Sequence, residues 1–292
     1  MLGAICGDII GSAYEFDNTK DYNFKLFCPY SNFTDDSVMT VAVAQWLLND
    51  EEHTHRMLEK YMVAIAEKCR YPIGGYGDMF YHWIFGPWAL RGRNGYPDDG
   101  KRHPYGSWGN GSAMRASACG WFFDTLEETE RVAGISASIT HNHPEGIKGA
   151  QATAVAIWMA RNGKSKDEIK DYISSRYGYD LHRTYEFLNL TYGWNSSCMG
   201  TVPEAIIAFL ESADFEDAIR KAVSIGGDSD TLACITGGIA EAYYKEIPEE
   251  IKDIVWGKLP KEFREIIKMV ADRTAYGDVF SRMELDVNDN EF

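Results

Sequence analysis

The spacing of apolar residues predicts an all-α protein. Apolar residues recur at intervals of three and four along much of the chain, whereas strand signals are nearly absent. Helix starts show the expected chemistry, with a capping box at 165–168 and with Pro203, Pro248 and Pro260 near first turns. In chain order, the main expected helices are 38–48, 57–69, 112–123, 150–161, 169–176, 202–210, 215–223, 232–244 and 263–270.

Several of these expected helices are rich in Ala, Gly and Ser, as at 149–154 and 234–240. Gly237 and Gly238 inside a helix should each cost up to about 1 kcal/mol relative to Ala. We therefore expect tight helix packing or a nearby ligand at these two glycines.

Two acidic clusters lie near opposite ends of the chain, each at the start of an expected helix. They read Thr-Asp-Asp-Ser at 34–37 and Gly-Asp-Ser-Asp-Thr at 227–231. Either cluster alone is explained as a helix N-cap, and Thr34 and Thr231 are expected to begin their helices. Several carboxylates in one turn repel one another, however, and hard oxygen ligands suit Mg²⁺ or Ca²⁺ better than zinc. The preferred hypothesis is a metal site shared by both clusters.

A glycine-spaced segment at 7–15 predicts a short N-terminal helix that ends in a carboxylate. Asp8 and Glu15 are spaced by two turns, which would place them on one helix face. A metal-dependent hydrolase needs a carboxylate that takes a proton from metal-held water, and Glu15 is our candidate base. An ordinary surface glutamate is the alternative.

The glycine-rich run Gly-Ser-Trp-Gly-Asn-Gly-Ser at 106–112 leads into the expected helix 112–123. Such a junction offers backbone N–H groups to a phosphate, assisted by the helix dipole. The run lacks the Gly-Lys-Ser/Thr ending of a Walker A loop, so a simple connecting loop is an equal alternative. The segment Gly-Gly-Tyr-Gly-Asp at 74–78 adds some weight to ligand binding.

The run Thr-His-Asn-His-Pro at 140–144 has two of the seven histidines. No third histidine or cysteine stands nearby at metal-ligand spacing, so zinc is disfavoured. We prefer a histidine that hydrogen-bonds to a ligand or stacks on it, at His141, over a histidine with a structural role.

Composition excludes several classes of protein. The net charge of −15 argues against long nucleic acid as a partner, and the six cysteines are scattered as expected for reduced thiols. The longest apolar run, 152–160, is far shorter than the roughly 20 residues that span a bilayer. The N-terminus is a poor signal peptide, so we expect a cytoplasmic protein that does not bind membranes. We expect one domain over 1–283, a long irregular stretch at 86–111 and an acidic tail at 284–292.

Taken together, these motifs resemble the ADP-ribosylglycohydrolase family, which includes dinitrogenase reductase-activating glycohydrolases and vertebrate ADP-ribosyl-acceptor hydrolases. The resemblance extends over roughly residues 1–275. Its motifs occur in family order at 7–15, 34–37, 74–77, 109–115, 140–141 and 226–231. Residues 86–105 match no family motif, so acceptor choice is a hypothesis for this segment.

The resemblance implies a compact orthogonal multi-helix fold with a binuclear metal cleft. Two Mg²⁺ ions are expected, with Mn²⁺ as the alternative. The implied metal ligands are Thr34, Asp35, Asp36, Asp228, Asp230 and Thr231. Glu15 and Asp36 are assigned catalytic roles. The residues assigned to ligand binding are Gly75, Gly77, Gly106, Ser107, Trp108, Asn110 and His141.

The expected activity is removal of ADP-ribose from an acceptor, with cleavage of the N-glycosidic bond of ADP-ribosyl-arginine or another guanidino group as the leading hypothesis. O-linked serine or small-molecule conjugates are the alternative acceptors. ADP-ribose binding without turnover, a structural role and a Mg²⁺-dependent nucleotide phosphohydrolase are competing functions. The expected partners are ADP-ribose and an ADP-ribosylated protein or small molecule, and we expect a monomer.

Overall fold

The computed structural model describes residues 1–86 and 99–283, and every extended regular element in these ranges is a helix. This confirms the prediction of an all-α protein. One isolated bridge joins Gly109 and Ser197. The α-helices are α1 (Leu2–Gly11), α2 (Asp35–Asn49), α3 (His55–Lys68), α4 (Asp78–Phe85), α5 (Gly111–Met114), α6 (Ser117–Phe122), α7 (Leu126–Ser138), α8 (Pro144–Arg161), α9 (Lys166–Tyr177), α10 (Tyr185–Thr191), α11 (Cys198–Leu210), α12 (Phe215–Ser224), α13 (Ser229–Tyr244), α14 (Glu249–Lys258), α15 (Lys261–Arg273) and α16 (Gly277–Phe280).

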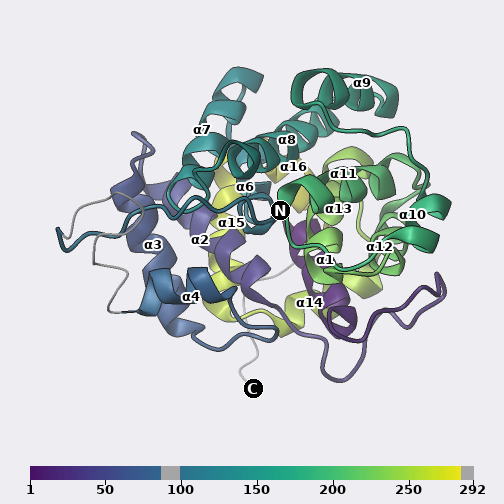
Figure 1. The fold of residues 1–292 in the computed structure, drawn as a ribbon, viewed down its shortest axis with the longest axis horizontal. Coiled ribbons are helices and arrows are strands. Elements are labelled where there is room, and N and C mark those ends of the chain that lie inside the picture. Colours follow the sequence, from purple (N-terminus) through teal and green to yellow (C-terminus); the bar gives the residue numbers. More distant parts are fainter. Residues whose placement is uncertain (87–98, 284–292) are drawn as a thin grey trace.

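Helices α1 and α13 form the centre of the molecule, and the N-terminal helix lies directly beside one from the C-terminal part of the chain (Figure 1). Every residue of α1 is buried. A Cβ atom on Gly7 would lie 1.9 Å from the carbonyl oxygen of Ala233, and one on Gly237 would lie 2.1 Å from that of Gly3. Backbone therefore packs on backbone here, which explains the helical Gly237 as tight packing.

The other helices surround this central pair. Helix α2 packs against α3, α6 and α15, and α8 packs against α7, α6 and α13. Helices α11 and α12 cover α13 on the side away from α3 and α4 (Figure 1). The first turns of α2 and α13 are thereby held in the interior, next to α1.

The expected helix 112–123 is wrong in one respect, because it is broken into α5 and α6. Arg115 leaves the helical conformation with φ −91° and ψ 1°. Its fully buried guanidinium donates to the carbonyl of Ser136 and the hydroxyl of Thr140, each at 2.9 Å. This buried anchor accounts for a break that apolar spacing alone did not indicate.

Other helix ends also differ from expectation. Helix α8 begins at Pro144, with His143 as its N-cap, and α11 begins at Cys198, which leaves Pro203 inside the helix. Helices α4, α7, α10 and α14 were not among the main expected helices. Helix α7 buries mostly small or polar side chains, such as Thr129, Ala133 and Ser136, so its apolar periodicity is weak.

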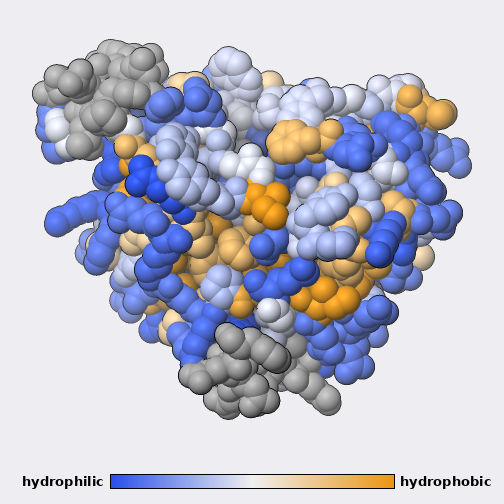
Figure 2. Space-filling model, turned by 90° about the horizontal axis from the view of Figure 1, so that it is seen from below, coloured by the Kyte–Doolittle hydropathy of each residue, from blue (hydrophilic) through white to orange (hydrophobic). Residues whose placement is uncertain are grey.

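The face seen from below is hydrophilic at its margins, and hydrophobic side chains gather toward its middle (Figure 2). All six cysteines are free thiols, as expected. Among the described residues, no helix has the length and apolar character needed to cross a membrane. The irregular stretch expected at 86–111 is confirmed for 99–110, whereas 87–98 and the expected tail at 284–292 lie outside the described residues.

We predict that Gly7→Ala destabilises the protein by about 2 kcal/mol or more, because the new methyl group would force α1 and α13 apart. The control is Gly257→Ala in α14, where a Cβ atom meets nothing within 4 Å and should stabilise by about 0.5 kcal/mol. Denaturant unfolding of both variants measures the difference. Equal stability of the two variants would contradict the close helix contact.

Candidate active-site cleft

A cleft of about 490 Å³ opens at the first turns of α2 and α13. Its volume lies in the range typical of small-molecule sites. Carboxylates from both ends of the chain line it, together with glycines and aromatic side chains from the loops between. The carboxylates that line the cleft are Glu15, Asp35, Asp36, Asp78, Asp228 and Asp230.

Asp8 in α1 holds the start of α2 in place. Its Oδ1 accepts a hydrogen bond from the Thr34 hydroxyl at 2.7 Å, and its Oδ2 accepts from the backbone N–H groups of Thr34 and Ser37, each at 3.1 Å. The Ser37 hydroxyl also donates to this carboxylate. Burial raises the pKa of Asp8 to about 6, and the four donors oppose this rise. Asp8 thus directs Asp35 and Asp36 toward the cleft.

Two glycines shape the entry into α13. Gly226 and Gly227 both have positive φ angles, 79° and 76°, a backbone conformation that residues with a Cβ atom rarely adopt. The Asn18 side chain binds Gly227 on both sides, because its Nδ2 donates to the carbonyl at 2.9 Å and its Oδ1 accepts from the N–H at 2.6 Å. The loop after α1 is thereby fastened to the start of α13.

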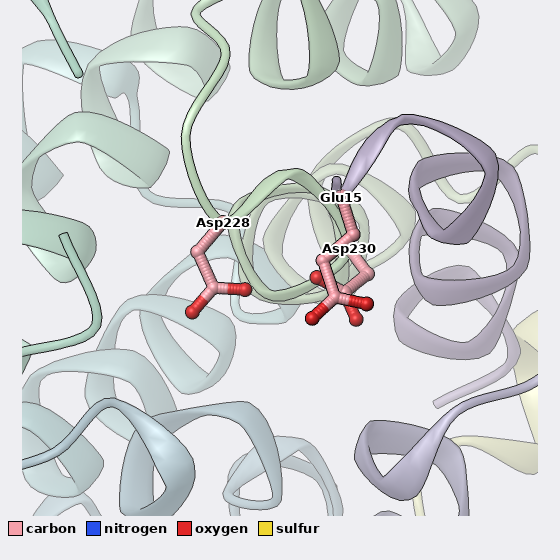
Figure 3. A group of neighbouring side chains, drawn as sticks. All are labelled: Glu15, Asp228 and Asp230. Atoms are coloured by element: carbon pink, nitrogen blue, oxygen red, sulfur yellow. The ribbon is translucent and has the colours of Figure 1, made fainter. Parts of the chain in front are cut away.

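This fastening brings Glu15, Asp228 and Asp230 together (Figure 3). Glu15 comes from the segment after α1, and the two aspartates come from the start of α13. Each offers an oxygen within 4.8 Å of the others, an arrangement that can hold a metal ion. The Thr231 hydroxyl also lies 3.4 Å from Asp36 Oδ1, so the two acidic clusters meet.

Burial and mutual repulsion raise the pKa values of these carboxylates. The pKa of Glu15 rises to about 7, chiefly through burial and then through Asp228 and Asp8. The pKa values of Asp36 and Asp230 lie well above the usual 3.8, again mainly through burial and then through neighbouring carboxylates. Such a cluster favours either bound protons or a bound cation.

Three buried carboxylate oxygens in this cluster have no hydrogen-bond partner: Glu15 Oε2, Asp36 Oδ2 and Asp230 Oδ1. A buried acceptor without a partner is costly, and a cation satisfies it. Asp228 differs, because the Asn110 amide donates to its Oδ2 at 2.7 Å and so orients it. The oxygen-only donor set fits a hard divalent ion such as Mg²⁺ or Mn²⁺.

Of the six residues expected as metal ligands, Asp35, Asp36, Asp228, Asp230 and Thr231 line the cleft. Thr34 does not, because its hydroxyl donates to Asp8 and accepts from the N–H of Asp36 as the N-cap of α2. Thr231 is inside α13 rather than at its cap, since Asp228 is the N-cap.

Asp8 and Glu15 do not form a pair on one helix face. Helix α1 ends at Gly11, and a short 3₁₀ helix at Ser12–Tyr14 separates it from Glu15. Asp8 therefore supports α2 from inside the protein, whereas Glu15 lines the cleft.

The residues expected to bind the rest of the ligand separate into two groups. Gly75, Gly77, Ser107, Asn110 and His141 line the cleft. Gly106 and Trp108 are not among the lining residues. The Trp108 ring instead packs edge-on against the ring of His143, with the two ring centroids 5.3 Å apart.

The helix dipole expected after the glycine-rich loop is small, because α5 has only four residues. The segment before α11 holds the glycine-rich loop, since the Asn110 N–H donates to the carbonyl of Ser196 at 2.8 Å.

His141 is neutral in this cleft. Burial and the nearby Arg115 guanidinium lower its pKa well below 6.5, and its Nδ1 shares a 2.7 Å hydrogen bond with the Thr140 hydroxyl. The ring packs beside Gly109 and Gly111, and its centroid lies 6.0 Å from the centroid of the Tyr105 ring. A neutral imidazole serves a ligand as a hydrogen-bond partner rather than as a charge.

Two aromatic residues of the cleft, Phe16 and Trp194, were not among the candidate site residues predicted from the sequence. Phe16 follows Glu15 directly, and Trp194 follows the glycine of a Tyr-Gly-Trp-Asn turn. Aromatic residues beside a candidate base and in a turn were the available signal. Their proximity to each other depends on the tertiary fold.

The comparisons with known proteins agree with this geometry. The model of the ADP-ribosylglycohydrolase family matches residues 1–282. The ADP-ribosylhydrolase ARH3 of Homo sapiens is 26% identical over 321 residues, covering 85% of this chain and 86% of ARH3. An uncharacterized protein of Archaeoglobus fulgidus is 33% identical over 154 residues, which cover 48% of this chain and 50% of that protein.

A solved structure described as an ADP-ribosylglycohydrolase-related protein complex matches with a TM-score of 0.66 and covers 97% of this chain and 96% of that one. At 18% identity, this likeness shows the fold alone. The match to the family model over almost the whole chain shows more: the protein belongs to the ADP-ribosylglycohydrolase family and is a hydrolase of that family.

Proposed function

We propose that this protein releases ADP-ribose from a guanidino acceptor, with ADP-ribosyl-arginine as the leading substrate. The observation that carries the proposal is the cleft where the two acidic clusters meet Glu15. A guanidinium group is always charged at neutral pH, and Glu15 and Asp78 line the cleft as carboxylates outside the proposed metal-ligand set, so they can attract it. Serine and small neutral acceptors lack this attraction and form the second candidate class.

We infer that Asp35, Asp36, Asp228, Asp230 and Thr231 hold two Mg²⁺ ions, with Mn²⁺ as a substitute. The unpartnered oxygens of Asp36 and Asp230 support this inference. Thr34 stays in the proposed set through its place at the start of α2, although its hydroxyl is engaged by Asp8. When bound, the ions supply electrophilic assistance and fix the orientation of the substrate hydroxyls and of a water molecule.

Glu15 is proposed to transfer the proton. Glu15 lines the cleft beside Asp228 and Asp230, and its Oε2 has no hydrogen-bond partner, so this carboxyl group is placed to exchange a proton with a bound substrate or water. It can therefore take a proton from water or give one to the leaving acceptor nitrogen. Asp36 is proposed to assist from the other cluster by stabilising positive charge as the glycosidic bond breaks.

The rest of the substrate is proposed to lie along the glycine-rich loops. The Ser107 hydroxyl can donate to the ligand, whereas Asn110 can offer only its side-chain oxygen, because its amide group already donates to Thr201 and Asp228. The glycines 75 and 77 leave room for a close approach of the ligand to the backbone. The proposed set also includes Gly106 and Trp108, the chain neighbours of the lining residue Ser107. His141 would add a neutral hydrogen-bonding ring, and the buried Arg115 adds positive charge for the diphosphate.

We expect Mg²⁺-dependent release of intact ADP-ribose from an arginine-linked ADP-ribosyl peptide, measured by chromatography beside a serine-linked peptide. Glu15→Gln should abolish most turnover but keep ADP-ribose binding by calorimetry, because only the proton carrier is removed. Release from the serine-linked peptide alone would overturn the arginine assignment. Binding without release from either peptide would favour a non-catalytic reader, and AMP or phosphate as the product would favour a phosphohydrolase.

Asp230→Asn should lower both magnesium affinity and turnover by at least on the order of 100-fold, because even groups that only orient metal ligands contribute about 10- to 100-fold. The metal-free variant should fold as well as the wild type, since one repelling charge is removed. Isothermal titration with Mg²⁺ and a turnover assay check both statements. The matched control is Asp253→Asn, an exposed aspartate in α14 that should change neither quantity. Unchanged metal affinity in Asp230→Asn would contradict the proposed site.

Thermal stabilisation by Mg²⁺ should depend on pH. The folded pKa of Glu15, about 7, lies above its ordinary value of 4.5, so the metal-free protein loses stability as pH rises through this window. Mg²⁺ competes with these protons, so its effect should be small at pH 5 and larger at pH 7.5. With Mg²⁺ at 100-fold its dissociation constant, we expect Tm to rise by about 5 °C at pH 7.5. Calorimetric scans with Mg²⁺ or chelator measure this, and an equal rise at both pH values would refute the prediction.

A further inference from the structure

An exposed aromatic pair stands at the rim of the cleft. The rings of Phe16 and Trp194 stack with centroids 5.9 Å apart and planes 19° apart, yet the two residues are 74% and 55% exposed. Both residues line the same cleft as Glu15. Large apolar side chains gathered at one exposed place usually mark an interaction site, because leaving them in water is unfavourable.

The loops that present this pair are fastened to each other. The Lys20 ammonium donates to the carbonyl of Tyr192 at 2.9 Å, and the Asn189 amide donates to the carbonyl of Lys20 at 3.0 Å. The Tyr192 hydroxyl donates to the carbonyl of Gly200 at 2.7 Å, which anchors the second loop to α11. The aromatic pair is therefore a preorganised surface, which lowers the entropic cost of binding.

Trp194 also lines a second hollow of about 290 Å³. Phe187 and Thr191 from α10 line this hollow, together with Tyr192 and Asn195. Phe187 is itself 52% exposed. The cleft and the hollow thus share Trp194 as a lining residue.

The position of the pair relates it to the acceptor rather than to the adenine. Phe16 is the chain neighbour of Glu15, the proposed proton carrier, and both residues line the cleft. The acceptor is attached at the reacting centre, whereas the adenine is separated from it by two riboses and a diphosphate. Trp108, in the glycine-rich loop, packs on His143 and is not among the residues that line the cleft.

We propose that Phe16, Trp194 and the adjoining hollow form a binding surface for the polypeptide that carries the ADP-ribose. A single acceptor side chain ends near the rim, but a polypeptide at about 3.3–3.6 Å per residue continues into the hollow. There Phe187 is suited to an apolar side chain of a bound strand, and the exposed Thr191 hydroxyl, which already donates to the Phe187 carbonyl, can still accept from a backbone N–H. This inference rests on the proposed hydrolase function and selects a protein acceptor over a small molecule.

The test compares two substrates with the same glycosidic bond: an arginine-linked ADP-ribosyl peptide of about ten residues, and ADP-ribosyl-arginine without flanking residues. Trp194→Ala and Phe187→Ala should each lower kcat/KM for the peptide about tenfold more than for the single amino acid, a loss of about 1.4 kcal/mol. The loss should be in KM rather than in kcat. Trp194→Phe should restore most of the peptide preference, because it keeps an aromatic ring.

Leu190→Ala is the matched control, since Leu190 is 82% exposed on the same helix α10 but lines neither the cleft nor the hollow. It should affect both substrates equally. Equal losses on the two substrates in Trp194→Ala and Phe187→Ala would overturn the proposal. So would a dimer in light scattering that either variant converts to monomer, because a second copy would then occupy the surface.

Failure of the hydrolase function is distinguishable from failure of this surface. If the wild-type protein cleaves neither substrate, its affinity for the intact ADP-ribosyl peptide shows whether the aromatic surface binds the polypeptide. Wild type should then bind the peptide about tenfold more tightly than Trp194→Ala does, with equal affinities for free ADP-ribose. Equal peptide affinities of the two proteins would reject the surface.

Discussion

The contact between α1 and α13 is the constraint on which the rest of the structure depends. Glycines at positions 3, 7 and 11 let α1 approach the backbone of α13 to distances that no Cβ atom permits. This contact fixes both ends of α1. Asp8 then reaches the start of α2, and the loop after α1 delivers Glu15 to the carboxylates at the start of α13. A looser helix pair would separate these groups by several ångströms, and the acidic cleft would not form.

The cleft concentrates negative charge where burial makes charge costly. The raised pKa values of Glu15, Asp36 and Asp230 reflect the free-energy cost of ionising buried carboxyl groups. The packing of the helices around the site offsets this cost. Groups that destabilise a protein persist where they serve function. The cleft also has lining residues of another character, because the pKa of His141 lies well below 6.5 and Arg115 contributes a buried guanidinium group.

Sequence reasoning identified the helices whose apolar stripe is wide, and it identified the two acidic clusters through their unusual density of carboxylates. It missed α7, which buries small and polar side chains, and it joined α5 to α6 because the anchor at Arg115 is a tertiary contact. Among site residues, it expected Trp108 in the cleft lining and overlooked Phe16 and Trp194. Aromatic residues in loops have no periodicity, so only the fold shows which of them meet.

The sequence by itself determined the all-α class, the family resemblance and the acidic composition of the candidate site, because helix periodicity and side-chain type are local properties of the chain. The tertiary structure decided which of these residues share one space. It turned the Thr34 hydroxyl toward Asp8, separated Asp8 from Glu15, and joined Glu15 to Asp228 and Asp230. These outcomes depend on the close approach of α1 to α13 and on the positive φ angles of the glycines before Asp228, and such long-range geometry is not encoded in any short stretch of residues.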